Sequence, residues 1–169
     1  MTAISLTEIE AARTRQAGVV LRTPLVYSHT LSRAGGREVF LKLENLQTTG
    51  SFKLRGAINR LSLLKARGEG TRVVAASAGN HGQGVAFAAA YLGLPATIVM
   101  PRGASISKQL ATRGYGAEVI LHGRDLGEAL ARAQELVIQG YTFIHPYDDP
   151  EVIAGQGTLG LEIIEDLPG

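Results

Sequence analysis

The 169-residue sequence contains no cysteine and no tryptophan, and only 5% of its residues are aromatic. Without cysteine the chain cannot form a disulfide framework, and zinc-ribbon, iron–sulfur and cysteine-nucleophile sites are excluded as well. Proline is scarce at 6 residues, while 45% of all residues are hydrophobic and 19% are charged. This composition is typical of a globular chain that builds an apolar core, and it excludes disorder as the main description.

Long hydrophobic runs are also missing. The most apolar stretch, residues 85–101, is interrupted by Gly93 and Pro95, so it predicts a helix followed by a strand rather than a membrane span. The first residues do not place an apolar segment behind a basic one, so no secretory signal is expected. These features predict a soluble cytoplasmic protein without a membrane partner.

The net charge of +2 is unevenly distributed along the chain. Six acidic residues and no Lys or Arg occur from Asp148 onward, which leaves the preceding part strongly basic. The basic residues are scattered, however, and no run alternates them with aromatic residues as single-strand binders do. We therefore expect a solvated surface and no nucleic-acid partner.

The hydrophobic pattern predicts an α/β fold. A helix is expected over residues 6–20 with Thr7 as its cap, and a strand over 38–44 that alternates Val39, Leu41 and Leu43 with Glu38, Lys42 and Glu44. Further helices are expected over 51–67, 80–92, 105–113, 125–139 and 149–166, and strands over 72–76, 96–100, 117–121 and 141–144. This alternation indicates three-layer β/α units with a mainly parallel sheet that helices cover on both faces.

Residues 155–160 (Gly-Gln-Gly-Thr-Leu-Gly) match the dinucleotide-binding string G-x-G-x-x-G. No convincing strand precedes the string, and the acidic residue expected about twenty positions later would lie beyond residue 169. We therefore interpret the match as a false positive rather than as a Rossmann loop.

Residues 77–84 (Ser-Ala-Gly-Asn-His-Gly-Gln-Gly) lie between a predicted strand and a predicted helix. Such a junction presents unpaired backbone N–H groups and the positive end of a helix to an anion. The alternative is a tight turn in which Asn80 caps the helix.

Lys53 falls in the first turn of the helix predicted over 51–67. A cation there opposes the helix dipole at a cost of about 0.3–1 kcal/mol, and the same field lowers the pKa of the amine. An amine that serves as nucleophile or base needs a lowered pKa, although an exposed Lys at a helix start is also common. His29, His122 and His145 lack the spacing of metal ligands, so no metal site is expected.

Two ordered motifs resemble those of the threonine dehydratase family, which are pyridoxal-phosphate enzymes of fold type II related to serine dehydratases and serine racemases. Residues 44–47 (Glu-Asn-Leu-Gln) lead into residues 51–56 (Ser-Phe-Lys-Leu-Arg-Gly), which are similar to the family's cofactor-lysine signature. Residues 77–81 resemble its substrate-carboxylate loop, and the likeness continues through 101–105, 145–149 and 155–158. The resemblance implies that the dinucleotide-like string is an ordinary loop and helix start. Ala78, where racemases tend to have a second Ser, favours a dehydratase.

The resemblance implies a role for each matching residue. Lys53 would form the Schiff base with pyridoxal phosphate and later remove the Cα proton of the substrate. Phe52 would pack against the cofactor, and Asn80 would bind its ring 3-oxygen. The substrate carboxylate would be held by Ser77, Gly79, Asn80 and His81. For His81 itself we favour a loop-shaping role over that of a general acid.

The resemblance also implies an organisation and a reaction. Residues 1–70 and 148–169 would belong to a large cofactor domain, which is only partly present, and 71–147 would form a complete small α/β domain. The complete enzyme would be a cytoplasmic homo-oligomer that converts L-threonine or L-serine to a 2-oxo acid and ammonia, for example in isoleucine biosynthesis. Because the family's phosphate-binding glycine run is absent, we expect these 169 residues alone to be inactive. The alternative is a non-catalytic truncated product or binding module.

Overall fold

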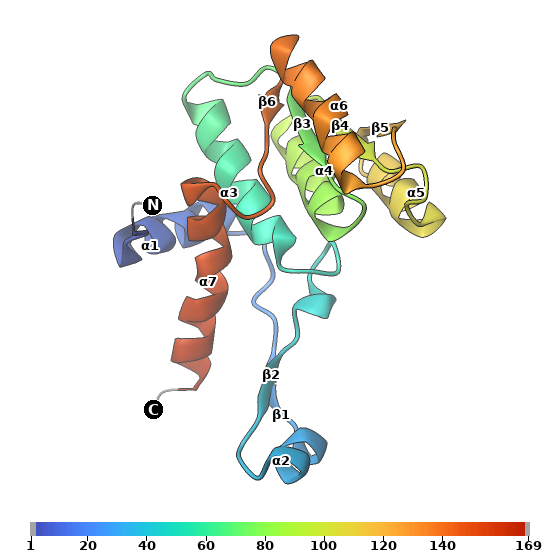
Figure 1. Ribbon diagram of the computed structural model, residues 1–169. Coiled ribbons are helices and arrows are strands. Elements are labelled where there is room, and N and C mark those ends of the chain that lie inside the picture. The colour runs from blue at the N-terminus through green and yellow to red at the C-terminus, as the bar shows by residue number, and fades with distance from the viewer. Residues whose placement is uncertain (1–2, 168–169) are drawn as a thin grey trace.

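The computed structural model describes residues 3–167, and Figure 1 shows the arrangement of its elements. The helices are α1 (Leu6–Gln16), α2 (His29–Gly35), the 3-10 helix η1 (Glu44–Leu46), α3 (Lys53–Ala66), α4 (Asn80–Leu92), α5 (Ile106–Gly114), α6 (Leu126–Ile138) and α7 (Pro150–Asp166). The strands are β1 (Leu25–Tyr27), β2 (Phe40–Lys42), β3 (Val73–Ala76), β4 (Ala96–Met100), β5 (Glu118–Leu121) and β6 (Thr142–Phe143).

The main sheet has the strand order β5-β4-β3-β6, and all of its neighbouring strands are parallel. Successive residues of β3 face opposite sides of this sheet. Val73 and Ala75 join the apolar cluster that includes α3 and α4, while Val74 and Ala76 pack with α6. Helices therefore cover both faces, which confirms the predicted α/β fold with a parallel sheet.

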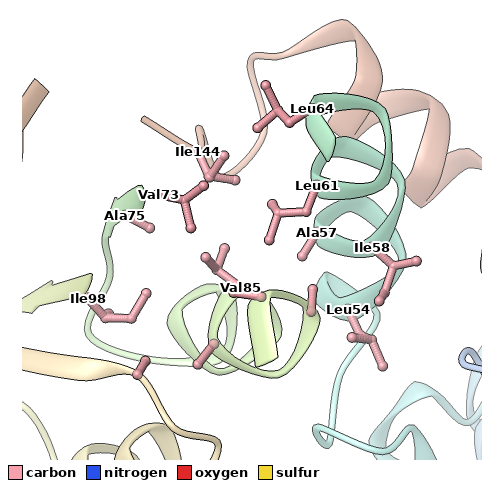
Figure 2. Close-up of a cluster of buried hydrophobic side chains, with 14 of the residues drawn as sticks. Leu54, Ala57, Ile58, Leu61, Leu64, Val73, Ala75, Val85, Ile98 and Ile144 are labelled. Carbon is pink, nitrogen blue, oxygen red and sulfur yellow. The ribbon is translucent and has the colours of Figure 1, made fainter. Parts of the chain in front are cut away.

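The larger apolar cluster lies between α3, α4 and one face of the sheet (Figure 2). Leu61 and Leu64 on α3 point toward Val73 on β3 and Val85 on α4, and Leu54 at the start of α3 belongs to the same cluster; these five side chains are at most 1% exposed. Each such side chain contributes about 1.5–3 kcal/mol relative to its exposed state. The same cluster thus fixes α3, which begins at Lys53, against the sheet.

Helix α1 begins at Leu6, as expected, but its cap differs from the prediction. The cap is Ser5 rather than Thr7, because the Ser5 hydroxyl accepts a hydrogen bond from the Glu8 N–H while the Glu8 carboxylate accepts one from the Ser5 N–H. The helix ends at Gln16 rather than at residue 20, and Gly18 then turns the chain with φ of 78°. At the other end of the chain, the sequence predicts that the last helix stops at Pro168 and Gly169, and these two residues lie outside the described residues.

Strand β2 pairs antiparallel with β1, apart from the main sheet, and its two faces are opposite to the prediction. Leu41 is 37% exposed, whereas the side chain of Lys42 is only 6% exposed. Lys42 is buried because its amine lies 2.7 Å from the Glu162 carboxylate and donates a 2.6 Å hydrogen bond to the Thr23 carbonyl. The ion pair satisfies a charge that the alternation pattern assigned to solvent. The prediction missed β1 and α2 altogether.

The glycines of residues 155–160 lie inside helix α7, which confirms the helix expected over residues 149–166 and shows that the loop implied by the family resemblance is wrong. A Cβ atom on Gly155 would lie 2.6 Å from the Arg55 carbonyl and 2.8 Å from the Cα of Gly56. A Cβ on Gly157 would lie 3.0 Å from Ile9 of α1. These glycines therefore let α7 approach α3 and α1 closely.

Five of the six acidic residues of the last segment pair with basic residues of the N-terminal part, which explains the uneven charge. Helix α7 packs against α1 and α3, and the basic partners lie on these two helices, in the segments that follow them, and on β2. The pairs are Asp149–Arg60, Glu151–Arg60, Glu151–Arg67, Glu162–Lys42, Glu162–Arg55, Glu165–Arg13, Glu165–Arg22, Asp166–Arg22 and Asp166–Lys42. A purely solvated basic surface is therefore not what the structure has. No helix within residues 3–167 has both the length and the apolar character needed to cross a membrane.

Candidate active site

Lys53 is the first residue of α3 and follows the loop of residues 47–52. Its amine donates a 2.8 Å hydrogen bond to the Pro146 carbonyl and lies 5.1 Å from the centre of the Phe52 ring. Burial lowers the pKa of the Lys53 amine below its ordinary value. Lys53 thus lies in the first turn of a helix, as the sequence predicts, but burial rather than the field of the helix end lowers the pKa of its amine.

The loop after β3 delivers residues 77–81 to the start of α4. Gly79 occupies the cap position, and Asn80 is the first residue of the helix, so the alternative in which Asn80 is the cap is wrong. No side chain of the described chain caps this end, and the Ser77 hydroxyl accepts a 3.2 Å hydrogen bond from the Gly79 N–H. The first N–H groups of α4 are thus available to an anion, as the other interpretation requires.

Asn80 contacts a residue that sequence reasoning missed. Its side-chain oxygen accepts a 2.8 Å hydrogen bond from the Lys108 amine on α5. Since a lysine amine has donors only, this bond leaves the Asn80 amide NH₂ group free to donate to another acceptor. The two residues lie 28 positions apart, and no local pattern in the sequence signals their contact.

His81 is buried at 5% exposure, and its Nε2 lies 3.0 Å from the Ile144 carbonyl. Burial, with smaller contributions from the charges of Lys53 and His145, lowers the pKa of His81 to about 4. The ring is therefore neutral at pH 7, where it cannot act as an imidazolium acid.

Residues 144–146, which lead from β6 toward α7, bring the two predicted motifs together. The Ile144 carbonyl contacts His81, and the Pro146 carbonyl contacts Lys53. Helices α3 and α4 approach closely at the same place, as shown by the 3.1 Å between a Cβ on Gly84 and the Lys53 carbonyl carbon. The amine of Lys53 and the open end of α4 thus belong to one site, while Phe52 remains 37% exposed beside it.

The polar groups around this site suit a ligand that has an aldehyde carbon and anionic oxygens, as pyridoxal phosphate does. Among residues 3–167, the hydroxyls of Thr49 and Ser51, Nδ1 of His81 and the amide nitrogen of Gln83 are buried without a hydrogen-bond partner. Unsatisfied buried groups are costly, and a bound polar ligand can satisfy them. The described residues include no group of three or more His, Asp or Glu side chains arranged to hold a metal ion.

Residues 17–169 match a protein family described as "Pyridoxal-phosphate dependent enzyme". The chain is 55% identical over 168 residues to an L-threonine ammonia-lyase from Thermotoga maritima, covering 98% of this chain and 41% of that protein. It is 50% identical over 165 residues to a catabolic L-threonine dehydratase from Escherichia coli, covering 97% and 50%. The chain thus spans half or less of the length of these two relatives.

Solved structures show the same fold. A processed threonine deaminase isoform from Solanum lycopersicum has a TM-score of 0.86 at 41% identity, covering 96% of this chain and 45% of that one. A serine racemase from maize has a TM-score of 0.92 at 35% identity, covering 98% and 51%. Together with the paired Lys53 and α4 motifs, these findings show that the chain belongs to the family of pyridoxal-phosphate dependent enzymes.

Proposed function

We propose that the protein containing this chain catalyses the pyridoxal-phosphate-dependent β-elimination of L-threonine or L-serine to a 2-oxo acid and ammonia. The observation that carries the proposal is the position of Lys53, whose partly buried amine lies beside the uncapped start of α4. The relatives named L-threonine ammonia-lyase and L-threonine dehydratase support the reaction class.

Lys53 has two tasks in this proposal. Its amine would hold the cofactor covalently, and once displaced by the substrate's own amine it would be placed to remove the proton from the substrate Cα. A lowered pKa serves both tasks, because only the neutral amine is a nucleophile or a base. When bound, pyridoxal phosphate supplies a conjugated ring that accepts the negative charge developing at Cα.

The start of α4 binds and orients the substrate. The backbone N–H groups of Asn80 and His81, together with the Ser77 hydroxyl and the Gly79 N–H that bonds it, would bind the substrate carboxylate, whose negative charge the helix end favours. Asn80 would donate a hydrogen bond from its amide NH₂ group to the ring oxygen of the cofactor, since its own side-chain oxygen accepts from Lys108. Phe52 packs against the ring, and neutral His81 fixes the loop through Ile144 rather than transferring a proton.

The organisation expected from the resemblance is part of the same proposal. Residues 1–70 and 148–169 would form part of the cofactor domain, consistent with the contact of α7 with α1 and α3. Residues 71–147 would form the small α/β domain, although α3 shares its apolar cluster. The complete enzyme would be a cytoplasmic homo-oligomer. Because the names of several relatives contain the word catabolic, the biosynthetic role expected above is not included.

The proposal is tested by assaying the full-length protein with pyridoxal phosphate and L-threonine or L-serine, and following 2-oxo acid over time. We expect production of 2-oxo acid, and we expect Lys53→Ala to abolish it. Lys65→Ala is the matched control, because Lys65 lies on the same helix and its amine bonds the distant Leu92 carbonyl. Racemisation without 2-oxo acid, or full activity of Lys53→Ala, would contradict the proposal.

A further inference from the structure

Two residues behind Lys53, the side chain of Arg55 is completely buried between two carboxylates. Its guanidinium bonds both oxygens of Glu44, at 2.9 and 2.8 Å, and both oxygens of Glu162, at 2.7 and 2.9 Å. Lys42 lies 2.7 Å from the second carboxylate. These four residues, called the charge cluster below, carry two positive and two negative charges.

The charge cluster joins the two ends of the segment of residues 44–55, which consists of η1, the loop of residues 47–52 and the start of α3 with Lys53. Glu44 begins η1 before the loop, and Arg55 follows Lys53 on α3, so their double hydrogen bond joins the two ends of the segment. The Thr23 hydroxyl donates a 2.6 Å hydrogen bond to Glu44 and fixes its carboxylate. Glu162, by contrast, connects Arg55 to α7 and takes no part in closing the loop.

Stability alone does not account for this arrangement. Moving a guanidinium and two carboxylates out of water costs several kcal/mol per ion, and apolar side chains of similar volume are often equally stabilising. What paired, bidentate hydrogen bonds provide beyond apolar contact is a fixed direction and distance. Here the hydrogen bonds fix the distance between Glu44 and Arg55, the two ends of the segment that contains Lys53.

We propose that Arg55 and Glu44 are positioning residues that hold Lys53 at its buried position by closing the loop of residues 44–55. The inference rests on the proposed function of Lys53. If the loop opens, the amine moves toward solvent and loses its contact with Pro146, and the desolvation that lowers its pKa decreases. Among the described residues, His81 on α4 is a titratable side chain whose pKa the charge of Lys53 helps to lower, and it stays neutral above about pH 4.

The test measures Lys53 in the cofactor-free, full-length protein. The protein is labelled with acetic anhydride at a series of pH values, and the acetylation of Lys53 is quantified by peptide mass spectrometry, with Lys65 as the internal standard. Glu44→Gln removes one charge from the loop closure. Glu162→Gln is the matched control, because it makes the same isosteric change in the other carboxylate that bonds Arg55. Thermal unfolding is recorded for both variants.

We expect the midpoint of Lys53 acetylation to lie below that of an ordinary lysine in the wild type and to rise in Glu44→Gln. It should stay unchanged in Glu162→Gln even if the thermal midpoint falls equally. An equal rise in both variants, or no rise in Glu44→Gln, would overturn the proposal. If Glu44→Gln does not fold, Thr23→Val replaces it, since this variant keeps both charges and loses only the hydroxyl that fixes Glu44.

For Thr23→Val we expect a smaller rise in the same direction, and no rise would overturn the proposal. The proposed function itself is measured separately, by covalent capture of pyridoxal phosphate on wild-type Lys53. Failure of that capture would remove the proposed function while leaving the labelling result valid for the position of the amine. The two failures can therefore be distinguished.

Discussion

Helix α3 takes part in two regions that are held together in opposite ways. On one side Leu54, Leu61 and Leu64 join an apolar cluster with β3 and α4 (Figure 2). On the other side Arg55 and Asn59, both fully buried, contact α7 and η1 through hydrogen bonds and ion pairs. The difference teaches that one helix can bury charged side chains on one face and only apolar side chains on the other. Lys53 directly precedes Leu54 and Arg55, the first residues of these two faces.

The largest expected effect is the loss of stability when one buried side chain of either region is replaced by alanine. Arg55→Ala leaves Glu44 and Glu162 buried with unpaired charges, so we expect it to lower the free energy of unfolding by about 3–5 kcal/mol. Leu61→Ala in the apolar cluster should cost about 2–5 kcal/mol by opening a cavity. Denaturant unfolding of both variants checks this prediction, and a cost of less than about 1 kcal/mol for Arg55→Ala would contradict it.

The next effect depends on pH and concerns His81. Its pKa falls from 6.5 to about 4 on folding, so the unfolded chain binds a proton between these pH values and the folded chain does not. Stability should therefore be complete above pH 6.5 and decrease by about 3 kcal/mol as the pH falls to 4.

We expect His81→Gln to flatten this part of the pH dependence of unfolding. The control is His29→Gln, which removes an exposed histidine. An unchanged slope between pH 6.5 and 4 in His81→Gln would show that His81 is not the group responsible.

A smaller effect tests the close approach of α7 to α3. A Cβ on Gly155 would lie 2.6 Å from the Arg55 carbonyl and 2.7 Å from the Cβ of Asn59, so Gly155→Ala should cost about 1–3 kcal/mol. Gly160→Ala on the same helix meets nothing within 4 Å and should instead stabilise by about 0.5–1 kcal/mol. Chemical denaturation measures the change in the free energy of unfolding for both variants. Changes of opposite sign support the packing role of Gly155, and changes of the same sign argue against it.

The smallest expected effect on stability concerns the exposed ion pairs at the end of α7. Glu165 pairs with Arg13 and Arg22, and hydrogen bonds from both lower the pKa of its carboxyl. Exposed pairs of this kind contribute little and are screened by salt. We expect Glu165→Gln to unfold at almost the same temperature as the wild type, and any difference to vanish in high salt. A loss as large as that of Arg55→Ala would contradict the distinction between buried and exposed pairs.

The apolar half of the fold could be predicted from the sequence. The bounds expected for α4 and β4 agree with the structure, because buried apolar residues with clear breakers between them determine these elements. Sequence reasoning also indicated the positions of Lys53 and of the junction before α4. These features depend on local patterns, such as a strand followed by a glycine-rich loop and a helix.

The polar half could not be predicted in the same way. A buried ion pair looks like an exposed one in the sequence, and the partner of Arg55 on α7 lies 107 positions away. For this reason the exposed and buried faces of β2 were reversed, and the glycines within α7 were interpreted as a loop. The contacts of Lys108 with Asn80 and of His81 with Ile144 likewise depend on tertiary structure, which no local pattern reports.

The most direct test of the account is to find which residue carries the cofactor. The full-length protein is incubated with pyridoxal phosphate, reduced with borohydride, digested and mapped by mass spectrometry. The account predicts a single modified residue, Lys53, and no stable modification in Lys53→Ala. A label on Lys42, Lys65 or Lys108 in its place would contradict the proposed site.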